Sequence, residues 1–172
     1  MYRRICEALD EMPNLDPDMH HAMRRGALQR TRALFRTISN DLTRRTGAAF
    51  CTGNGGAKKP HTDHAVPLRL IHDRILGVTS SGKPDPTTED MYDSPEAIEQ
   101  FVARFVVGVL VAPGDHTTLN KEFKCDMPAA WDWDEEAEGD AGIMGRYHLI
   151  KLQYHPRGEC DRCRESDPER RA

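Results

Sequence analysis

At 172 residues the chain is long enough for one domain with its own core. Hydrophobic residues make up 38% and charged residues 30%, and no apolar run approaches the roughly 18 residues of a membrane span. The first residues, MYRRICEALDEM, lack the apolar segment of a secretory signal, and five cysteines is an odd number for a disulfide framework. We therefore expect a protein of the reducing cytoplasm that does not span a membrane.

The formal net charge of −4 hides a strong separation of charge along the chain. Residues 20–45 contain seven arginines, no lysine and one acid, Asp41, whereas residues 126–140 contain seven acids and no lysine or arginine. These two charged segments are therefore a better guide to binding partners than the net charge is.

The basic segment is predicted to be one long helix, at about residues 17–45. Asp16 and Pro17 suit its start, apolar residues recur at helical spacing, and Gly47 suits the position after its end. Two interpretations of its basic face stay open: a solvated face on a core helix, or contact with a phosphate backbone, which the planar guanidinium fits well. In the second case the candidate nucleic-acid contacts are Arg25, Arg32 and Arg36.

The remaining elements alternate between short strands and helices. We expect a strand at 48–51, a Gly-rich turn without the spacing of a nucleotide-binding loop, a helix at 66–76 and a loop at 77–93. A helix from Ser94, a buried strand at 106–113, a short helix from Pro113, an acidic loop and a final strand within 146–155 follow. This pattern predicts an α+β protein, a mainly helical single domain with a small β-hairpin.

Residues that could bind a metal ion or act as an acid or base lie in two short segments, HTDH (61–64) and DHTTLN (115–120). Asp63 offers the hard oxygen that Mg²⁺ or Mn²⁺ prefers, and the neighbouring His64 could activate a water molecule. His116 and Asn120 lie one helical turn apart and could complete the site. The alternative is an Asp-His pair that caps the following helix and a short polar helix face; His61 is interpreted as a surface or capping residue.

HTDHAVPLRL, followed by the strand VVGVLVA and the helix PGDHTTLNKEF, resembles the HNH, or His-Me finger (ββα-metal), nuclease module. The resemblance covers roughly residues 50–124. It implies that His64 is the general base, that Asp63 and His116 bind metal, and that Asn120 is a neighbour or substitute of His116. It also implies a ββα-metal-like core that carries a helical insertion.

The predicted organisation is therefore one domain in three parts. A basic helical part spans 1–47, the core spans 48–125 with its insertion at 77–105, and an acidic loop with a Cys-containing tail spans 126–172. In the tail, Cys160 and Cys163 have the spacing of half a zinc site, which Cys51, Cys125 or His155 could complete. Two free thiols are the alternative.

Two functions follow from these observations. The first is a Mg²⁺- or Mn²⁺-dependent endonuclease that hydrolyses DNA phosphodiester bonds, with His64 as general base. The alternative is a non-catalytic module that binds nucleic acid or an acidic protein through the arginine-rich helix. A hydrolase of another metal class is a weaker option, because no further His-x-His element is present.

Overall fold

The computed structural model describes residues 21–52, 60–79, 85, 94–133, 138–139, 142–157 and 159. Its elements are α2 (His21–Thr46), β1 (Phe50–Thr52), β2 (His61–His64), α3 (Leu68–Ile75), α4 (Pro95–Phe105), β3 (Gly108–Val111), α5 (Pro113–Glu122), α6 (Gly145–Leu149) and β4 (Tyr154–Pro156). The predicted α+β class is therefore confirmed. Among the helices in these ranges, none is both long and apolar enough to cross a membrane.

The chain divides into two compact units. Unit 1 comprises Met1–Leu42 and Leu68–Phe105, and unit 2 comprises Thr43–Pro67 and Val106–Ala172. The residues between β2 and β3, which include the predicted insertion at 77–105, contribute α3 and α4 to unit 1.

Unit 1 is helical, and its helices bury apolar faces at the expected spacing. Phe35 and Ile38 of α2 are buried, and the shorter helices contribute Ile71 and Ile75 from α3 and Ile98, Val102 and Phe105 from α4. Residues three and four apart lie on one side of a helix, so each of these sets forms a single apolar stripe.

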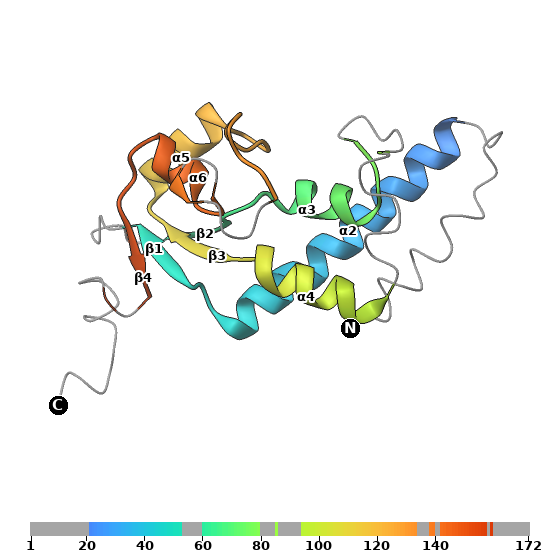
Figure 1. Cartoon of the computed structure of the whole chain (residues 1–172), viewed down its shortest axis with the longest axis horizontal. Helices are drawn as coiled ribbons and strands as arrows, with labels where there is room; N and C mark the ends of the chain where they lie inside the picture. Colours follow the sequence, from blue (N-terminus) through green and yellow to red (C-terminus); the bar gives the residue numbers. More distant parts are fainter. Residues whose placement is uncertain are drawn as a thin grey trace. The chain divides into compact units, whose positions relative to one another are not determined.

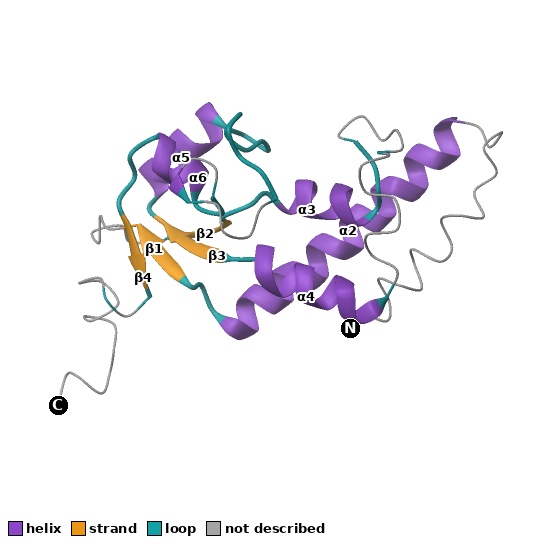
Figure 2. Cartoon of the chain, viewed as in Figure 1, coloured by secondary structure: helices purple, strands orange, loops and turns teal. Residues whose placement is uncertain are grey.

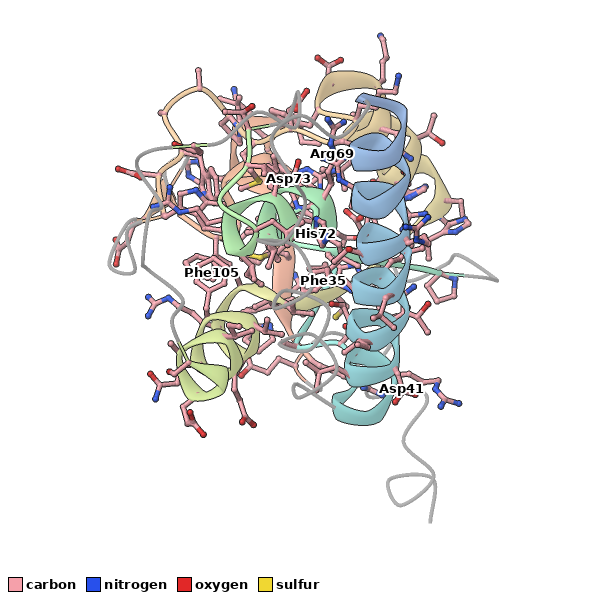
Figure 3. The ribbon with its side chains drawn as sticks, turned by 90° about the vertical axis from the view of Figure 1, so that its right-hand side faces the viewer. Phe35, Asp41, Arg69, His72, Asp73 and Phe105 are labelled. Carbon is pink, nitrogen blue, oxygen red and sulfur yellow. The ribbon has the colours of Figure 1, made fainter. Side chains whose placement is uncertain are left out.

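Unit 1 also contains a buried cluster of charged and aromatic side chains. The Asp73 carboxylate, only 5% exposed, accepts hydrogen bonds from Arg32 Nε at 3.0 Å and Arg32 Nη2 at 2.6 Å. Arg69 Nε lies 3.5 Å from the other Asp73 oxygen, and His72 Nδ1 lies 3.3 Å from Oδ1. Figure 3 shows His72 and Asp73 of α3 beside Phe35 of α2, whose ring centroid is 5.4 Å from that of His72. Arg32 thus joins α2 to α3.

Unit 2 is built on a mixed sheet with the strand order β2-β3-β1-β4 (Figure 1). β3 pairs with β2 in antiparallel and with β1 in parallel orientation, and β4 is antiparallel to β1. Figure 2 shows the four strands together, with the short helices α5 and α6 beside them.

One face of this sheet forms the core of unit 2. Val109 and Val111 of β3 are fully buried with Leu119 of α5 and with Met144 and Tyr147 beside and within α6. Gly108 lies on the opposite face, where a Cβ atom would come 2.5 Å from the methyl group of Thr43. Glycine is therefore required where Thr43 lies against the strand.

The prediction of a final strand within 146–155 is wrong for its first half. Residues 145–149 form α6, and only Tyr154–Pro156 form a strand. The chain leaves α6 through Lys151, whose φ of 55° is left-handed, while Leu152 N–H donates to the Tyr147 carbonyl at 2.9 Å. This bond closes the helix in the manner of a Schellman motif, which apolar periodicity alone does not predict.

The buried ion pair generates the first prediction. Arg32→Ala removes both hydrogen bonds to a buried carboxylate, so we expect the free energy of unfolding to fall by about 3 kcal/mol. Arg36→Ala removes an exposed arginine one turn further along α2 and is expected to change it by less than about 0.5 kcal/mol. Urea denaturation followed by circular dichroism measures both, and equal effects would contradict the structural role of Arg32.

Candidate functional site

The segment HTDH forms β2, and its pairing with β3 decides which way each side chain points. His61 is opposite Val111 and Asp63 is opposite Val109, whereas His64 is opposite Gly108. Directly paired residues lie on one face of a sheet, and successive residues alternate between faces. His61 and Asp63 therefore lie on the face of β2 that carries the core, α5 and α6, and His64 lies on the other face.

Asp63 is held by two adjacent residues of α6. Tyr147 Oη donates a hydrogen bond to Asp63 Oδ2 at 2.9 Å, and Arg146 Nη1 lies 3.5 Å from the same oxygen. Arg146 is only 2% exposed, and its Nη1 also donates to the His64 carbonyl at 3.2 Å. Burial, reinforced by the negative charge of Asp63, raises the pKa of Tyr147 well above its ordinary value, so the phenol stays protonated and remains a donor.

The second part of this face is a pair of histidines. The ring of His61 stacks on that of His116, with centroids 4.7 Å apart and an interplanar angle of 15°. His116 is on α5, where Asn120 Nδ2 lies 3.2 Å from its Nε2 and 3.3 Å from its Nδ1. Pro113 at the start of α5 and the buried Leu119 fix the helix beside β2, so its polar side presents these two residues.

His64 occupies a different environment. Its Nε2 forms a hydrogen bond with Thr43 Oγ1 at 3.1 Å, and its ring is half-buried. Burial lowers the pKa of His64 below its ordinary value; the neighbouring Asp63 opposes this effect, and Arg146 adds to it. The imidazole is therefore neutral at neutral pH, as a general base must be before it accepts a proton.

The structure thus brings Asp63, His116 and Asn120 to one side of β2 and turns His64 to the other. His61 is exposed, as expected, but it also contacts His116, so it belongs to the same face as Asp63. Sequence reasoning missed Arg146 and Tyr147 because the segment that holds them was predicted to be a strand without a site role. An adjacent arginine and tyrosine carry no signal that would have singled them out.

Of the residues proposed for the zinc site, the structure describes Cys51, Cys125 and His155, and Cys125 is exposed. Cys51 is 1% exposed in β1, and its thiol donates to the His155 carbonyl at 3.8 Å, an ordinary contact for a buried core cysteine. Cys160 and Cys163 lie outside the described residues. Within the described ranges, no group of three or more His, Cys, Asp or Glu side chains is arranged to hold a metal ion.

The candidate nucleic-acid contacts of α2 differ from one another. Arg36 is exposed, whereas Arg32 is committed to the ion pair with Asp73. The side chain of Arg25 lies outside the described residues. Comparisons of the chain with protein-family models, with curated proteins and with solved structures give no match.

The position of His64 predicts how stability depends on pH. Its folded-state pKa is lowered from 6.5, so below that pH the unfolded chain binds the proton more readily than the folded chain. The contribution to the free energy of unfolding is constant above pH 6.5 and is lost as the pH falls towards the folded pKa. His64→Gln is expected to remove this part of the decline as the pH falls below 6.5.

Urea unfolding followed by the fluorescence of Trp131 and Trp133, which are both in unit 2, measures this effect. His148→Gln replaces an exposed histidine of α6 and serves as the control, with an unchanged pH profile. A decline that is as steep in His64→Gln as in the wild type would contradict the prediction.

Proposed function

We propose that unit 2 is a divalent-metal-dependent endonuclease that hydrolyses phosphodiester bonds in DNA. The observation that carries this proposal is the arrangement of β2, β3 and α5, which brings Asp63 and His116 to one partly exposed side of the hairpin. A strand pair followed by a helix, with a carboxylate on the first strand and an imidazole on the helix, suits a metal that faces a phosphate group. DNA as the substrate comes from the family resemblance.

The donor set suits a metal that keeps much of its water. Asp63 supplies a carboxylate, His116 an imidazole and Asn120 an amide oxygen, while Mg²⁺ commonly uses one or two protein carboxylates with water and substrate phosphate. When bound, such an ion would polarise the phosphoryl oxygen and stabilise charge on the leaving oxygen.

Arg146 and Tyr147 have a positioning role in this proposal. Both contact the same oxygen of Asp63, so the other carboxylate oxygen is directed away from them. Because Arg146 is buried and ion-paired, it cannot turn outwards without leaving a carboxylate unpaired. The two residues therefore hold Asp63 in one orientation, as supporting side chains do in metal sites.

His64 is proposed as the general base. It is neutral at neutral pH because burial lowers its pKa, so it is able to accept a proton, although its ring lies on the face of β2 opposite to Asp63 and His116. Its Nε2 is bonded to Thr43 Oγ1, so this nitrogen must exchange the hydroxyl group for a water molecule before it can act.

A second candidate function is nucleic-acid binding without catalysis, through α2. It is favoured by Arg30 and Arg36, which are both exposed on this helix, in a segment whose only acid is Asp41. Arginine side chains at the surface of a helix are well suited to phosphate groups. The two functions are compatible, but they make different predictions.

Catalysis predicts metal-dependent nicking of supercoiled plasmid by the purified chain. We expect nicking with Mn²⁺ or Mg²⁺, no nicking with a chelator, and a loss of at least about a hundredfold in Asp63→Ala and in His64→Ala, since each removes a group needed in the transition state. His148→Ala is the matched control and should retain the wild-type rate. Nicking that resists chelator, or that is equal in all variants, would contradict the enzyme proposal.

Polyanion binding by α2 predicts a salt-dependent affinity for duplex DNA. Arg36→Ala should weaken binding at low salt and reduce the slope of log K against log salt by about 0.9, as expected for one lost phosphate contact. Lys124→Ala, an exposed cation of unit 2, is the control. Fluorescence anisotropy at several salt concentrations gives the slopes, and an unchanged slope in Arg36→Ala would remove this arginine from the interface.

A further inference from the structure

The exposed side of α2 combines residue types in an order that attraction to a polyanion alone does not require. At 3.6 residues per turn, six exposed side chains between residues 29 and 40 fall within about 120° of the helix circumference. In order around the helix, this polar face consists of Arg36, Gln29, Asn40, Ala33, Thr37 and Arg30. We infer that the polar face of α2 reads base edges in the major groove of duplex DNA. The inference rests on the second function proposed above, nucleic-acid binding through α2, and makes that binding selective for sequence.

The packing of unit 1 presents the polar face to solvent. Phe35 lies about 200° around the helix from Ala33, and its ring packs against His72 of α3 with centroids 5.4 Å apart (Figure 3). The hydrogen bonds from Arg32 to Asp73 of α3 fix the rotation of α2 about its own axis. The six side chains therefore project from a helix that is already folded and oriented, which lowers the entropy lost on binding.

The two arginines lie at the two edges of the polar face. Arg36 and Arg30 are about 120° apart around the helix and about 9 Å apart along its axis. The sequence from residue 29 to residue 40 contains no acid that would repel an anion. When a helix lies in a groove, the side chains at the edges of its inserted face are nearest to the phosphates, which arginine binds well. Such contacts position the helix without selecting a sequence.

The middle of the polar face is neutral and suits bases rather than phosphates. The amide groups of Gln29 and Asn40 have the donor and the acceptor that pair with the major-groove edge of adenine. Ala33 and Thr37 supply methyl groups, which suit the methyl group of thymine. Thr37 Oγ1 donates to the Ala33 carbonyl at 3.0 Å, so its hydroxyl group is already used and its methyl group is what it offers. These four residues therefore predict a preference for A·T base pairs.

The dimensions of the helix favour duplex DNA over RNA. An α-helix with its side chains is about 10–12 Å wide, and the major groove of B-DNA is about 12 Å wide. The rise along α2 from Gln29 to Asn40 is about 16.5 Å, which matches about five base pairs. The major groove of A-form RNA is too deep and narrow for side chains to read. Duplex DNA is therefore the partner that the polar face fits.

Selection from a pool of DNA duplexes with a randomised central segment tests the inference on the full chain, with a chelator present. We expect the enriched duplexes to share A·T base pairs at fixed positions. Because the chelator removes the metal on which the proposed nicking depends, the result does not depend on nuclease activity.

Variants of the polar face then show which residue reads which base pair. Gln29→Ala and Asn40→Ala should each lose about 5- to 150-fold of discrimination at one base pair of a selected duplex, as expected for one bidentate contact. Gln100→Ala, which replaces an exposed glutamine of α4, is the matched control and should keep the wild-type discrimination. Fluorescence anisotropy with singly substituted duplexes measures these ratios. Alanine is a strong helix former, so all three variants should keep the wild-type thermal unfolding.

The outcomes separate base reading from the functions proposed above. Selection without any enriched sequence, or unchanged discrimination in both amide variants, would overturn the inference. If all duplexes then bind alike with a steep salt dependence, the second function stands without base reading. Tighter binding to double-stranded RNA of the selected sequence would also overturn the inference, and a lack of binding to every duplex would contradict the second function as well.

Discussion

The antiparallel register between β2 and β3 is the constraint on which the candidate site depends. It fixes Asp63 opposite Val109 and His64 opposite Gly108, and so it decides which residues of HTDH meet α5 and α6. A shift by one residue would turn Asp63 away from Tyr147 and bring His64 to the core face. The shift would also turn Ala65, which directly follows β2 and is fully buried in the core of unit 2, away from that core.

The polar side chains that are buried next to these strands have specific partners. Arg146 and Tyr147 would be costly in an apolar core without partners, and both find one in Asp63. Unit 1 contains a comparable arrangement, in which Asp73 is surrounded by Arg32, Arg69 and His72. In each unit one described carboxylate organises its neighbours, and the one in unit 2 shares its face of β2 with the exposed His61.

Much of the fold could be predicted from sequence, and for identifiable reasons. Apolar spacing and Ser94-Pro95 predicted α4, the β-branched run predicted β3, and Pro113 predicted the start of α5. The helix α6 could not be predicted, because its closing residue is Lys151 rather than the usual glycine. The division into two units also could not be predicted from local sequence patterns, because nothing in the sequence shows that residues 68–105 belong with the N-terminal part of the chain.

For the candidate site the sequence supplied the residue types but not their directions. Asp63, His116 and Asn120 were singled out by chemistry and by resemblance, yet the exposed His61 was set aside and Arg146 and Tyr147 were missed. Side chains alternate between the two faces of a strand, so His61 shares the face of Asp63 and His64 does not. This alternation could not be predicted from the sequence, because HTDH could equally be interpreted as a polar loop.

The position of β3 in the sheet also has a consequence for the order in which the protein can assemble. β1 and β2 are both made before β3, and each pairs with β3 rather than with the other. During synthesis, β1 and β2 cannot pair with β3 until α3 and α4 have been made. The sheet can therefore form only after Gly108–Val111 has been made, and bringing these distant strands together costs loop-closure entropy.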